Sequence, residues 1–235
     1  MLQSFDRIVI VTAATAETRA VARGLGVEEI PQRRSLTFVR ERFGVLETGV
    51  GKVNAASAVA LASRELSGAA VLNVGVCGTL SPEAFGIGAA VLGMLSIQAD
   101  EGVATPDRFV TCAELGFPHG GAGVAEGEAP TATVAADLRP IVDGEGVIAT
   151  VSAGAGIDGL VTDRRDRVGA VVEAMEGAAI GQVCREIGAA FAEVRVVSNT
   201  TGDRAGQAWD LPTALARIER LVASIASVEV DRTGG

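Results

Sequence analysis

The 235-residue chain is long enough to bury a substantial apolar core without disulfide staples. Its net charge of −9 argues against a nucleic-acid partner, because a phosphate backbone attracts basic surfaces. The three cysteines are odd in number and widely spaced, so neither a disulfide framework nor a cysteine-rich metal site is expected.

In chain order, the first half begins with a strand rich in β-branched residues, followed by a helix that a glycine stops. A short hairpin and a second helical pattern come next, and then an almost wholly apolar run of the kind that a sheet covers on both faces. A turn with Gly75 and Gly78 is expected to end that run. These segments are strand 7–12, helix 16–25, strands 36–40 and 43–48, helix 53–67 and strand 69–76.

The second half opens with another apolar run and then a long stretch rich in Gly, Ala, Pro and acids, which we expect to be a loop or insertion. The final helix has Asp210 as its expected N-cap and a buried apolar stripe. The segments are strand 89–97, loop 102–130, strands 147–151 and 170–174, helix 175–187, strand 191–198, loop 199–210 and helix 211–228. Strands that alternate with helices throughout predict one three-layer α/β domain over residues 1–235.

Two of the predicted strands lead into segments that could bind a ligand, because open α/β sheets bind ligands at the carboxyl ends of their strands. Glu17 either faces such a ligand or complements the dipole of the helix that it opens. Gly49–Lys52 precedes a helix and could present backbone amides to an anion. It lacks the third glycine of a dinucleotide fingerprint and the GK[ST] of a P-loop, and Lys52 is most simply a solvated cation.

Three further candidates follow later strands. Cys77 is either a small buried residue or a nucleophile, but nothing in the sequence pairs it with His119, the only histidine. Glu176 lies in an otherwise apolar stretch, where a buried carboxylate needs a partner or a ligand; the alternative is a first-turn helix acid at the surface. Asn199 ends an apolar strand, where an amide facing a loop is common.

Taken together, five segments resemble the nucleoside phosphorylase/nucleosidase superfamily over nearly the whole chain, except across about 103–150. They are TAATAET at 12–18, ETGVGKVNAA at 47–56, LNVGVCGTL at 72–80, VEAMEGAAI at 172–180 and RVVSNTTGD at 195–203. The resemblance implies a nucleoside phosphorylase-like α/β fold with three αβα layers around a mixed central sheet. It also implies a small-molecule nucleoside substrate, no cofactor or metal, and assembly as a homodimer or larger homo-oligomer.

Carried over to matching positions, the resemblance implies a role for each candidate. Glu17 would hold the attacking water, and Glu176 would accept hydrogen bonds from the ribose 2′- and 3′-hydroxyls. Met175 would pack against the sugar and the base, and Asn199 would meet the leaving purine. The turn at 75–78 would line the floor of the site through Val76, Cys77 and Gly78.

Asn199 predicts which purine leaves. Adenosine-directed nucleosidases of this family carry an aspartic acid at the matching position, whereas an asparagine can only donate through its NH₂ group, to N7, O6 or both. A 6-oxopurine presents acceptors at both atoms, so we expect a nucleoside that releases hypoxanthine. Val76 stands where a phosphorylase often has a serine, and Arg19 and Arg23 lie on a helix outside the glycine turn, which favours water over phosphate as the nucleophile.

The stretch AMEGAA and the run SNTTGDR with Trp209 resemble the futalosine hydrolases of menaquinone biosynthesis. The alternatives are a methylthioadenosine/S-adenosylhomocysteine nucleosidase, a phosphate-dependent purine nucleoside phosphorylase and a non-catalytic nucleoside sensor. Departures from the family are the Gly/Ala-rich region 100–130 and the missing stacking aromatic near 152–156. Asp100 and Glu101 are additional candidate site acids without an assigned role. No apolar run reaches membrane-spanning length and no secretory signal is evident, so we expect a cytoplasmic protein with no membrane partner.

Overall fold

The computed structural model describes residues 2–28, 30, 32–119 and 127–227. Over these residues, nine strands form one mixed sheet in the order β10-β9-β5-β11-β4-β1-β3-β2, with β8 paired to β5. The strands of this sheet are β1 Ile8–Thr12, β2 Thr37–Arg40, β3 Phe43–Glu47, β4 Ala70–Thr79, β5 Ala90–Gln98, β8 Gly127–Glu128, β9 Gly144–Thr150, β10 Ala170–Ala174 and β11 Ala190–Thr200. The mixed sheet agrees with the predicted fold class.

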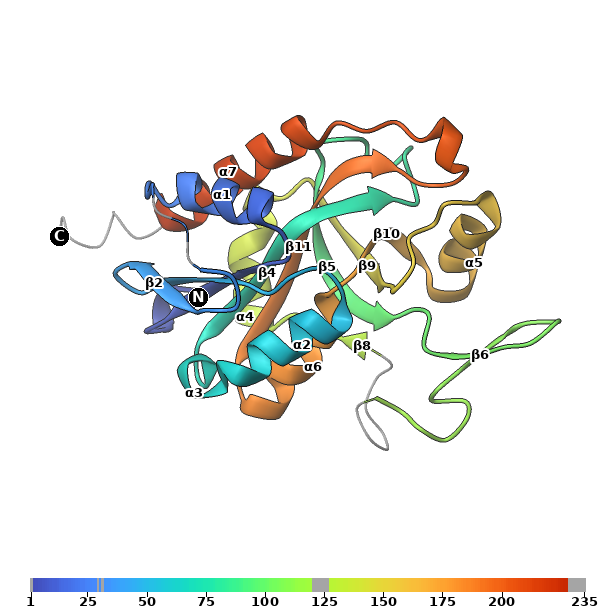
Figure 1. The fold of residues 1–235 in the computed structure, drawn as a ribbon, viewed down its shortest axis with the longest axis horizontal. Helices are drawn as coiled ribbons and strands as arrows, with labels where there is room; N and C mark the ends of the chain where they lie inside the picture. Colours follow the sequence, from blue (N-terminus) through green and yellow to red (C-terminus); the bar gives the residue numbers. More distant parts are fainter. Residues whose placement is uncertain (1, 29, 31, 120–126, 228–235) are drawn as a thin grey trace.

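Helices cover both faces of the sheet (Figure 1). Alternate residues of a strand point to opposite faces, so Ile8 and Ile10 of β1 pack into one apolar layer while Val9 and Val11 pack into the other. The first layer contains α1 Thr15–Gly24, α4 Ala132–Leu138 and α7 Leu211–Ser227, and the second contains α2 Lys52–Leu61, α3 Ser63–Leu66 and α6 Gly177–Ile187. The three-layer αβα arrangement is confirmed.

The predicted ends of two helices are confirmed. α6 ends at Gly188, whose φ of 68° lies in the left-handed region that glycine adopts without a steric penalty. α7 begins after Asp210, whose Oδ1 accepts a hydrogen bond from the Thr213 N–H at 3.0 Å. No helix among the described residues is both long enough and apolar enough to cross a membrane.

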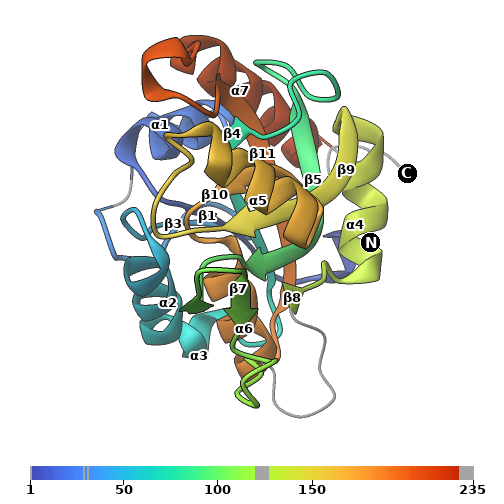
Figure 2. The ribbon, with the colours of Figure 1, turned by 90° about the vertical axis from the view of Figure 1, so that its right-hand side faces the viewer.

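Other predictions needed correction. The helix expected over 53–67 is divided at Ala62, and its residues Val53 and Leu61 are 82% and 78% exposed. Helices α4 and α5 (Asp158–Val168) were not predicted; the sequence of α5 is DGLVTDRRDRV, which has too few apolar residues to show a helical stripe. α5 covers the end of the sheet near β9 and β10 (Figure 2).

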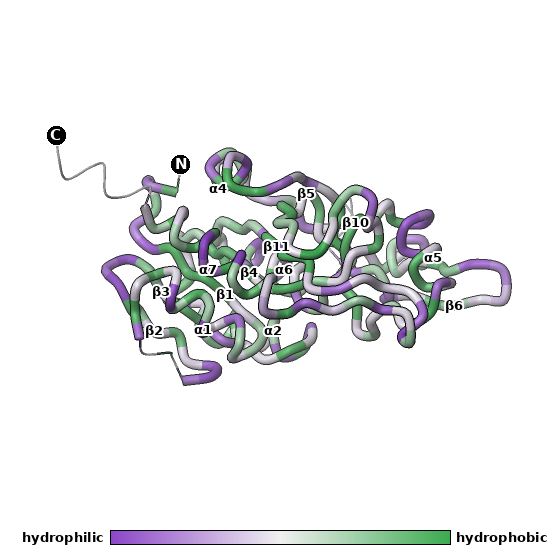
Figure 3. Tube along the Cα trace, turned by 90° about the horizontal axis from the view of Figure 1, so that it is seen from above, coloured by the Kyte–Doolittle hydropathy of each residue, from purple (hydrophilic) through white to green (hydrophobic). Residues whose placement is uncertain are grey.

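The stretch expected as a loop over 102–130 contains a second, two-stranded sheet. β6 Gly102–Ala104 and β7 Phe109–Thr111 pair antiparallel and form an arm that projects from the main body (Figure 3). The tip of this arm is hydrophilic, whereas the central strands are mostly hydrophobic. Part of the expected loop, residues 120–126, lies outside the described residues.

The prediction of a turn at Gly75–Gly78 is wrong, because β4 continues through both glycines to Thr79. β11 pairs with β4 along its whole length, from Ala70 to Thr79. On the opposite edge, β1 pairs with β4 only as far as Asn73, and β10 pairs with it only at Gly78 and Thr79. Between these two partners, the backbone of β4 is available to side chains. The candidate site lies at this change of partner.

Candidate active site

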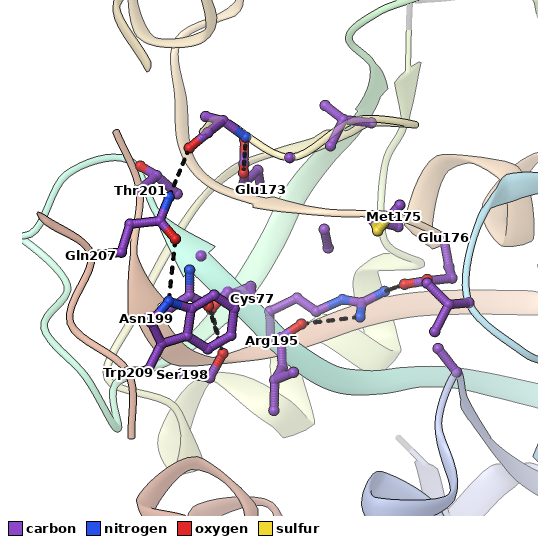
Figure 4. Close-up of a pocket in the computed structure, with 18 of the residues that line it drawn as sticks. Cys77, Glu173, Met175, Glu176, Arg195, Ser198, Asn199, Thr201, Gln207 and Trp209 are labelled. Atoms are coloured by element: carbon purple, nitrogen blue, oxygen red, sulfur yellow. Dashed lines mark hydrogen bonds and ion pairs between the residues drawn. The ribbon is translucent and has the colours of Figure 1, made fainter. Parts of the chain in front are cut away.

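A cavity of about 340 Å³ opens where β4 changes its partner. Its walls come from the β1–α1 junction, the end of β4, the β10–α6 junction, the end of β11 and the loop before α7. Glu17, Glu176 and Asn199, which lie far apart in the sequence, all line it. The other predicted site residues also line this cavity: Met175, Val76, Cys77 and Gly78. The spatial convergence on which the sequence interpretation depends is therefore present (Figure 4).

Glu17 is buried and uses both carboxylate oxygens. Its Oε2 accepts hydrogen bonds from the backbone N–H groups of Ala13 and Ala14, each at 2.9 Å, and so caps the start of α1. Its Oε1 accepts from the Val76 N–H at 2.8 Å, on the unpaired edge of β4. Burial raises the pKa of Glu17, although Arg195 and the backbone donors oppose the rise. The carboxyl group is thereby brought closer to the range in which it can exchange a proton.

Glu176 and Arg195 form a buried ion pair in the cavity wall. Arg195 Nη2 donates to Glu176 Oε2 at 3.1 Å, and the Gly51 N–H donates to Glu176 Oε1 at 2.9 Å. Glu176 is 3% exposed, so the surface position considered for it is wrong. Gly51 belongs to the predicted GxG segment, whose amide therefore meets a protein carboxylate.

Arg195 has a second carboxylate partner beneath the cavity. Its Nε donates to Glu193 Oε1 at 2.7 Å, and Glu193 also accepts hydrogen bonds from Ser96 and Asn73. Burial disfavours the charge of Arg195, but Glu193 and Glu176 outweigh it and raise its pKa above the ordinary value. Glu193 is fully buried, so the pair holds Arg195 charged and in one orientation.

Gly75 is required where these charges meet. A Cβ on this residue would lie 2.7 Å from Arg195 Nη1 and 2.7 Å from Glu17 Oε1, closer than side chains approach one another. The glycine therefore allows Arg195 and Glu17 to share one side of β4. The sequence indicated a turn at this glycine, whereas the structure shows a close approach within a strand.

Asn199 lies at the other end of the cavity with its amide oriented by neighbours. Its Oδ1 accepts a hydrogen bond from Ser198 Oγ at 2.8 Å, and its Nδ2 donates to the Thr200 carbonyl at 2.9 Å. An NH₂ group carries two hydrogens, so one remains for a ligand. The side chain therefore offers the cavity a donor.

A second buried ion pair stands beside Asn199. Glu173 lines the cavity, and its carboxylate accepts from the Ala155 N–H at 2.7 Å and pairs with Arg164. Arg164 also donates to the Ala153 carbonyl, so the pair anchors the loop that follows β9. Burial raises the pKa of Glu173, while the Ala155 amide and Arg164 act in the opposite direction.

The loop before α7 closes this end of the cavity. Gln207 Nε2 donates to the carbonyls of Ala155 and Gly202, and its Oε1 accepts from Arg204 and from the indole of Trp209. The Arg204 guanidinium also lies 4.8 Å from the centre of the Trp209 ring. Trp209 is 53% exposed and lines the cavity, so it acts as a partial cover for it.

Several other candidates lie outside this cavity. Lys52 is a half-buried ion-pair partner of Asp100 and Glu101, at 2.5 and 3.0 Å, so its assignment as a solvated cation is wrong. His119 Nε2 lies 3.5 Å from Glu101 Oε2 and does not line the cavity that Cys77 lines. Burial strongly raises the pKa of the Cys77 thiol, which suits a buried apolar residue better than a nucleophile.

Comparison with known proteins supports the same interpretation. A profile described as the phosphorylase superfamily matches residues 7–232. The chain belongs to this superfamily. Within it, a futalosine hydrolase of Acidothermus cellulolyticus is 34% identical over 226 residues, which cover 93% of this chain and 90% of that protein.

Solved structures of the superfamily share the fold. A futalosine hydrolase mutant of Helicobacter pylori superposes with a TM-score of 0.76 at 18% identity, covering 95% of this chain and 99% of that one. A 5′-methylthioadenosine/S-adenosylhomocysteine nucleosidase of Neisseria meningitidis gives 0.76 at 21% identity, with coverages of 94% and 99%. Because a futalosine hydrolase and a methylthioadenosine/S-adenosylhomocysteine nucleosidase superpose on this chain equally well, the fold does not discriminate between their substrates.

Three charged residues at the cavity were missed in the sequence analysis: Arg195 and Glu173, which line it, and Glu193, which holds Arg195 from beneath. Arg195 was noted only as part of a matching segment, and Glu193 and Glu173 were given no role. Each of them has apolar residues on both sides in a mostly buried strand. A charge in such a strand must have a partner, so the interruption of the apolar pattern was the signal that could have found them.

Proposed function

We propose that this chain is a futalosine hydrolase, which hydrolyses the N-glycosidic bond of a 6-oxopurine nucleoside and releases hypoxanthine. The 34% identity to a futalosine hydrolase over 93% of the chain supports the assignment. The observation that carries it is Asn199, which lines the same cavity as Glu17 and Glu176 and whose NH₂ group donates one of its two hydrogens to the Thr200 carbonyl, leaving the other for a ligand.

In the proposed reaction, the ribose binds at the end of the cavity that holds Glu176 and Arg195. Cleavage of an N-glycosidic bond passes through a sugar with positive charge, so a nearby carboxylate stabilises the transition state more than the substrate. Arg195 donates to Oε2 of Glu176, whereas Oε1 accepts a hydrogen bond from the Gly51 N–H. Oε1 can therefore accept further hydrogen bonds from the ribose hydroxyls.

Glu17 is the proposed general base. A water held by its carboxylate would lose a proton to it while attacking the sugar, and base catalysis needs a group whose pKa is near the working pH. Burial raises the pKa of Glu17 in that direction. Three backbone donors hold the carboxylate in place, so it need not reorganise during the reaction.

Asn199 is proposed to meet the departing purine. Negative charge develops on the base as the bond breaks, and a hydrogen bond to N7 or O6 stabilises it. An amide cannot deliver a proton, so this end of the cavity contributes hydrogen bonding only. Glu17 takes a proton from the attacking water, and the departing purine anion gains its proton from solvent to become hypoxanthine.

Water rather than phosphate is proposed as the nucleophile. Phosphate binding needs cationic or amide donors that are not already occupied. Of the described residues that line the cavity, Arg195 is bound to two glutamates and Arg204 to Gln207 and the Trp209 ring. An incoming phosphate would also meet Glu17 and Glu176, which repel it.

The test is base release from three nucleosides. The purified protein would be incubated with futalosine, inosine and 5′-methylthioadenosine, each with and without phosphate, and the free base followed by liquid chromatography. We expect hypoxanthine from futalosine at the same rate in both buffers. Release of adenine from methylthioadenosine instead, or an absolute requirement for phosphate, would reject the proposal.

We also propose that the protein assembles as a homo-oligomer. α2 presents Val53 and Leu61 almost fully to solvent, and Val50, at the cavity, is 49% exposed. Exposed large apolar side chains, here two on α2 and one in the segment before it, are typical of an interface. Light scattering on the purified protein should give at least twice the monomer mass, and Val53→Asp with Leu61→Asp should lower it. A monomeric mass for the unmodified protein would exclude this assembly.

A further inference from the structure

Three residues stand in one row across the end of the sheet. Gly78 of β4 is in register with Glu173 of β10 on one side and with Asn199 of β11 on the other. Residues that are neighbours across strands project towards the same face, and the middle one has no side chain. The row therefore forms a slot, with Glu173 and Asn199 as its sides and Gly78 as its base.

The slot is narrow enough for one ring edge to contact both sides. A Cβ built on Gly78 would lie 3.1 Å from Asn199 Nδ2 and 3.6 Å from Glu173 Cγ, so both side chains reach the same point. It would also lie 2.7 Å from Thr201 Cγ2, which leaves no room for an alanine. All four residues line the cavity.

The two sides of the slot have opposite hydrogen-bonding character. Asn199 has one amide hydrogen left to donate, because its oxygen and its other hydrogen are bound by Ser198 and Thr200. Glu173 accepts from the Ala155 N–H and from Arg164, and an ionised carboxylate can only accept. Two oxygens with two lone pairs each leave Glu173 able to accept one more hydrogen bond.

We propose that Glu173 is a second specificity-determining residue, which accepts the N1–H of a 6-oxopurine while Asn199 donates to O6 or N7. The inference rests on the proposed function. A 6-oxopurine places an acceptor, O6, beside a donor, N1–H, and the slot presents the complementary donor and acceptor. A 6-aminopurine has the reverse pattern, so its amino group faces a donor and its N1 faces the carboxylate.

Mismatch on both sides makes the slot selective. A buried group left without its partner weakens binding, so reading two atoms discriminates more strongly than Asn199 alone. Burial raises the pKa of Glu173, whereas the Ala155 N–H and the ion pair with Arg164 act against that rise and favour the ionised carboxylate that this role requires. The same ion pair anchors the loop at Ala153 and Ala155, so the test must separate recognition from anchoring.

The first measurement uses the unmodified protein and three bases. Binding of hypoxanthine, 1-methylhypoxanthine and adenine would be measured by calorimetry or as inhibition of futalosine cleavage. We expect hypoxanthine to bind about 10- to 100-fold more tightly than either of the others, because both lack the N1–H. Equal binding of hypoxanthine and 1-methylhypoxanthine would overturn the proposal, whatever any variant does.

The second measurement uses Glu173→Gln. The glutamine keeps an oxygen for the Ala155 N–H, but its NH₂ can donate to N1 of adenine. We expect the ratio of hypoxanthine to adenine affinity to fall about 10- to 100-fold. A role limited to anchoring would weaken both bases and leave their ratio unchanged, and that result overturns the proposal.

The matched control is Glu128→Gln, which removes a glutamate paired with Arg185 outside the cavity. Its affinity ratio should equal that of the unmodified protein. The experiments distinguish failure of the proposed function from failure of the proposed role of Glu173. If the unmodified protein releases no hypoxanthine from futalosine, the proposed function is rejected; if it does and the Glu173→Gln ratio is unchanged, only the role of Glu173 is.

Discussion

The two ends of the cavity are built in different ways. At one end, Glu176, Arg195 and Met175 lie on the strands and the helix junction of the central sheet, and Arg195 is bound to two carboxylates (Figure 4). At the other end, Asn199 and Trp209 belong to the end of β11 and the loop beyond it. This loop is held through Gln207, which bonds to two backbone carbonyls, to Trp209 and to Arg204, and the Arg204 guanidinium also contacts the Trp209 ring.

The difference suggests separate roles for the two ends in the proposed reaction. Charges at the sheet end are buried and mutually compensated, so under the proposed function they would act on a developing positive sugar without reorganising. At the loop end, the direction of each hydrogen bond matters more than charge, and direction is what separates one purine from another. Substitutions at the sheet end should therefore change the rate for every base, and substitutions at the loop end should change the preference between bases.

The largest effect is expected from Glu17→Gln. The amide cannot take a proton from water, and general base catalysis typically contributes about 10²–10⁴-fold, so kcat should fall by that factor for every base. The carboxylate accepts hydrogen bonds from three backbone N–H groups through both oxygens, and the NH₂ group of glutamine cannot accept one. The melting temperature should therefore fall as well. Stopped-time base release and thermal unfolding measure the two effects. An exposed control, Glu219→Gln, should keep full activity, and near-normal turnover of Glu17→Gln would remove Glu17 from its proposed role.

A strong but selective effect is expected from Asn199→Asp. A protonated aspartic acid can donate to N7 and accept from a 6-amino group, so the ratio of kcat/KM values should move about 100-fold towards adenine nucleosides. The ratio is measured with inosine and adenosine under the same conditions. An unchanged ratio would show that Asn199 does not contact the purine. The claim that the loop end sets the preference between bases would then fail.

A smaller effect on rate, with a distinctive pH dependence, is expected from Glu193→Gln. Arg195 loses one of its two carboxylate partners, so its charge acts more strongly on Glu17 and lowers the pKa of that group. Activity needs the Glu17 carboxylate and is lost as pH falls through its pKa, so the acid limb of kcat/KM should move to lower pH. We expect kcat to drop about tenfold through misplacement of Arg195. A drop in rate with an unmoved acid limb would mean that Glu193 only supports the fold.

The smallest effect is expected from Gln207→Leu. The substitution removes the amide that ties the loop at Ala155 to the loop at Gly202, at a cost of about 1–3 kcal/mol in the free energy of unfolding. KM for futalosine should rise by less than about fivefold, because Asn199 keeps its own partners. Chemical denaturation and steady-state kinetics measure both quantities. A loss of kcat as large as that of Glu17→Gln would contradict the division between the two ends.

Much of the fold could be predicted from local patterns. The strand at 7–12 and the helix ending at Gly188 follow from β-branched runs, apolar periodicity and a helix-stopping glycine, which act over a few residues. Helix α5 could not be predicted in this way, because it is mostly polar and is stabilised by tertiary packing against β9 and β10. The cytoplasmic location and the absence of a cofactor stay predictions.

The sequence by itself determined which residue types could do the chemistry: Glu17, Glu176 and Asn199 were chosen from motifs whose order and spacing match a family. Only the tertiary structure decided how they are used. β4 passes through Gly75 and Gly78 as a strand and exchanges β1 for β10, which exposes the Val76 amide to Glu17 and sets Glu173 opposite Asn199. Such pairings join residues roughly 60 to 120 positions apart, and local patterns carry no information about them because long-range strand pairing depends on the whole fold.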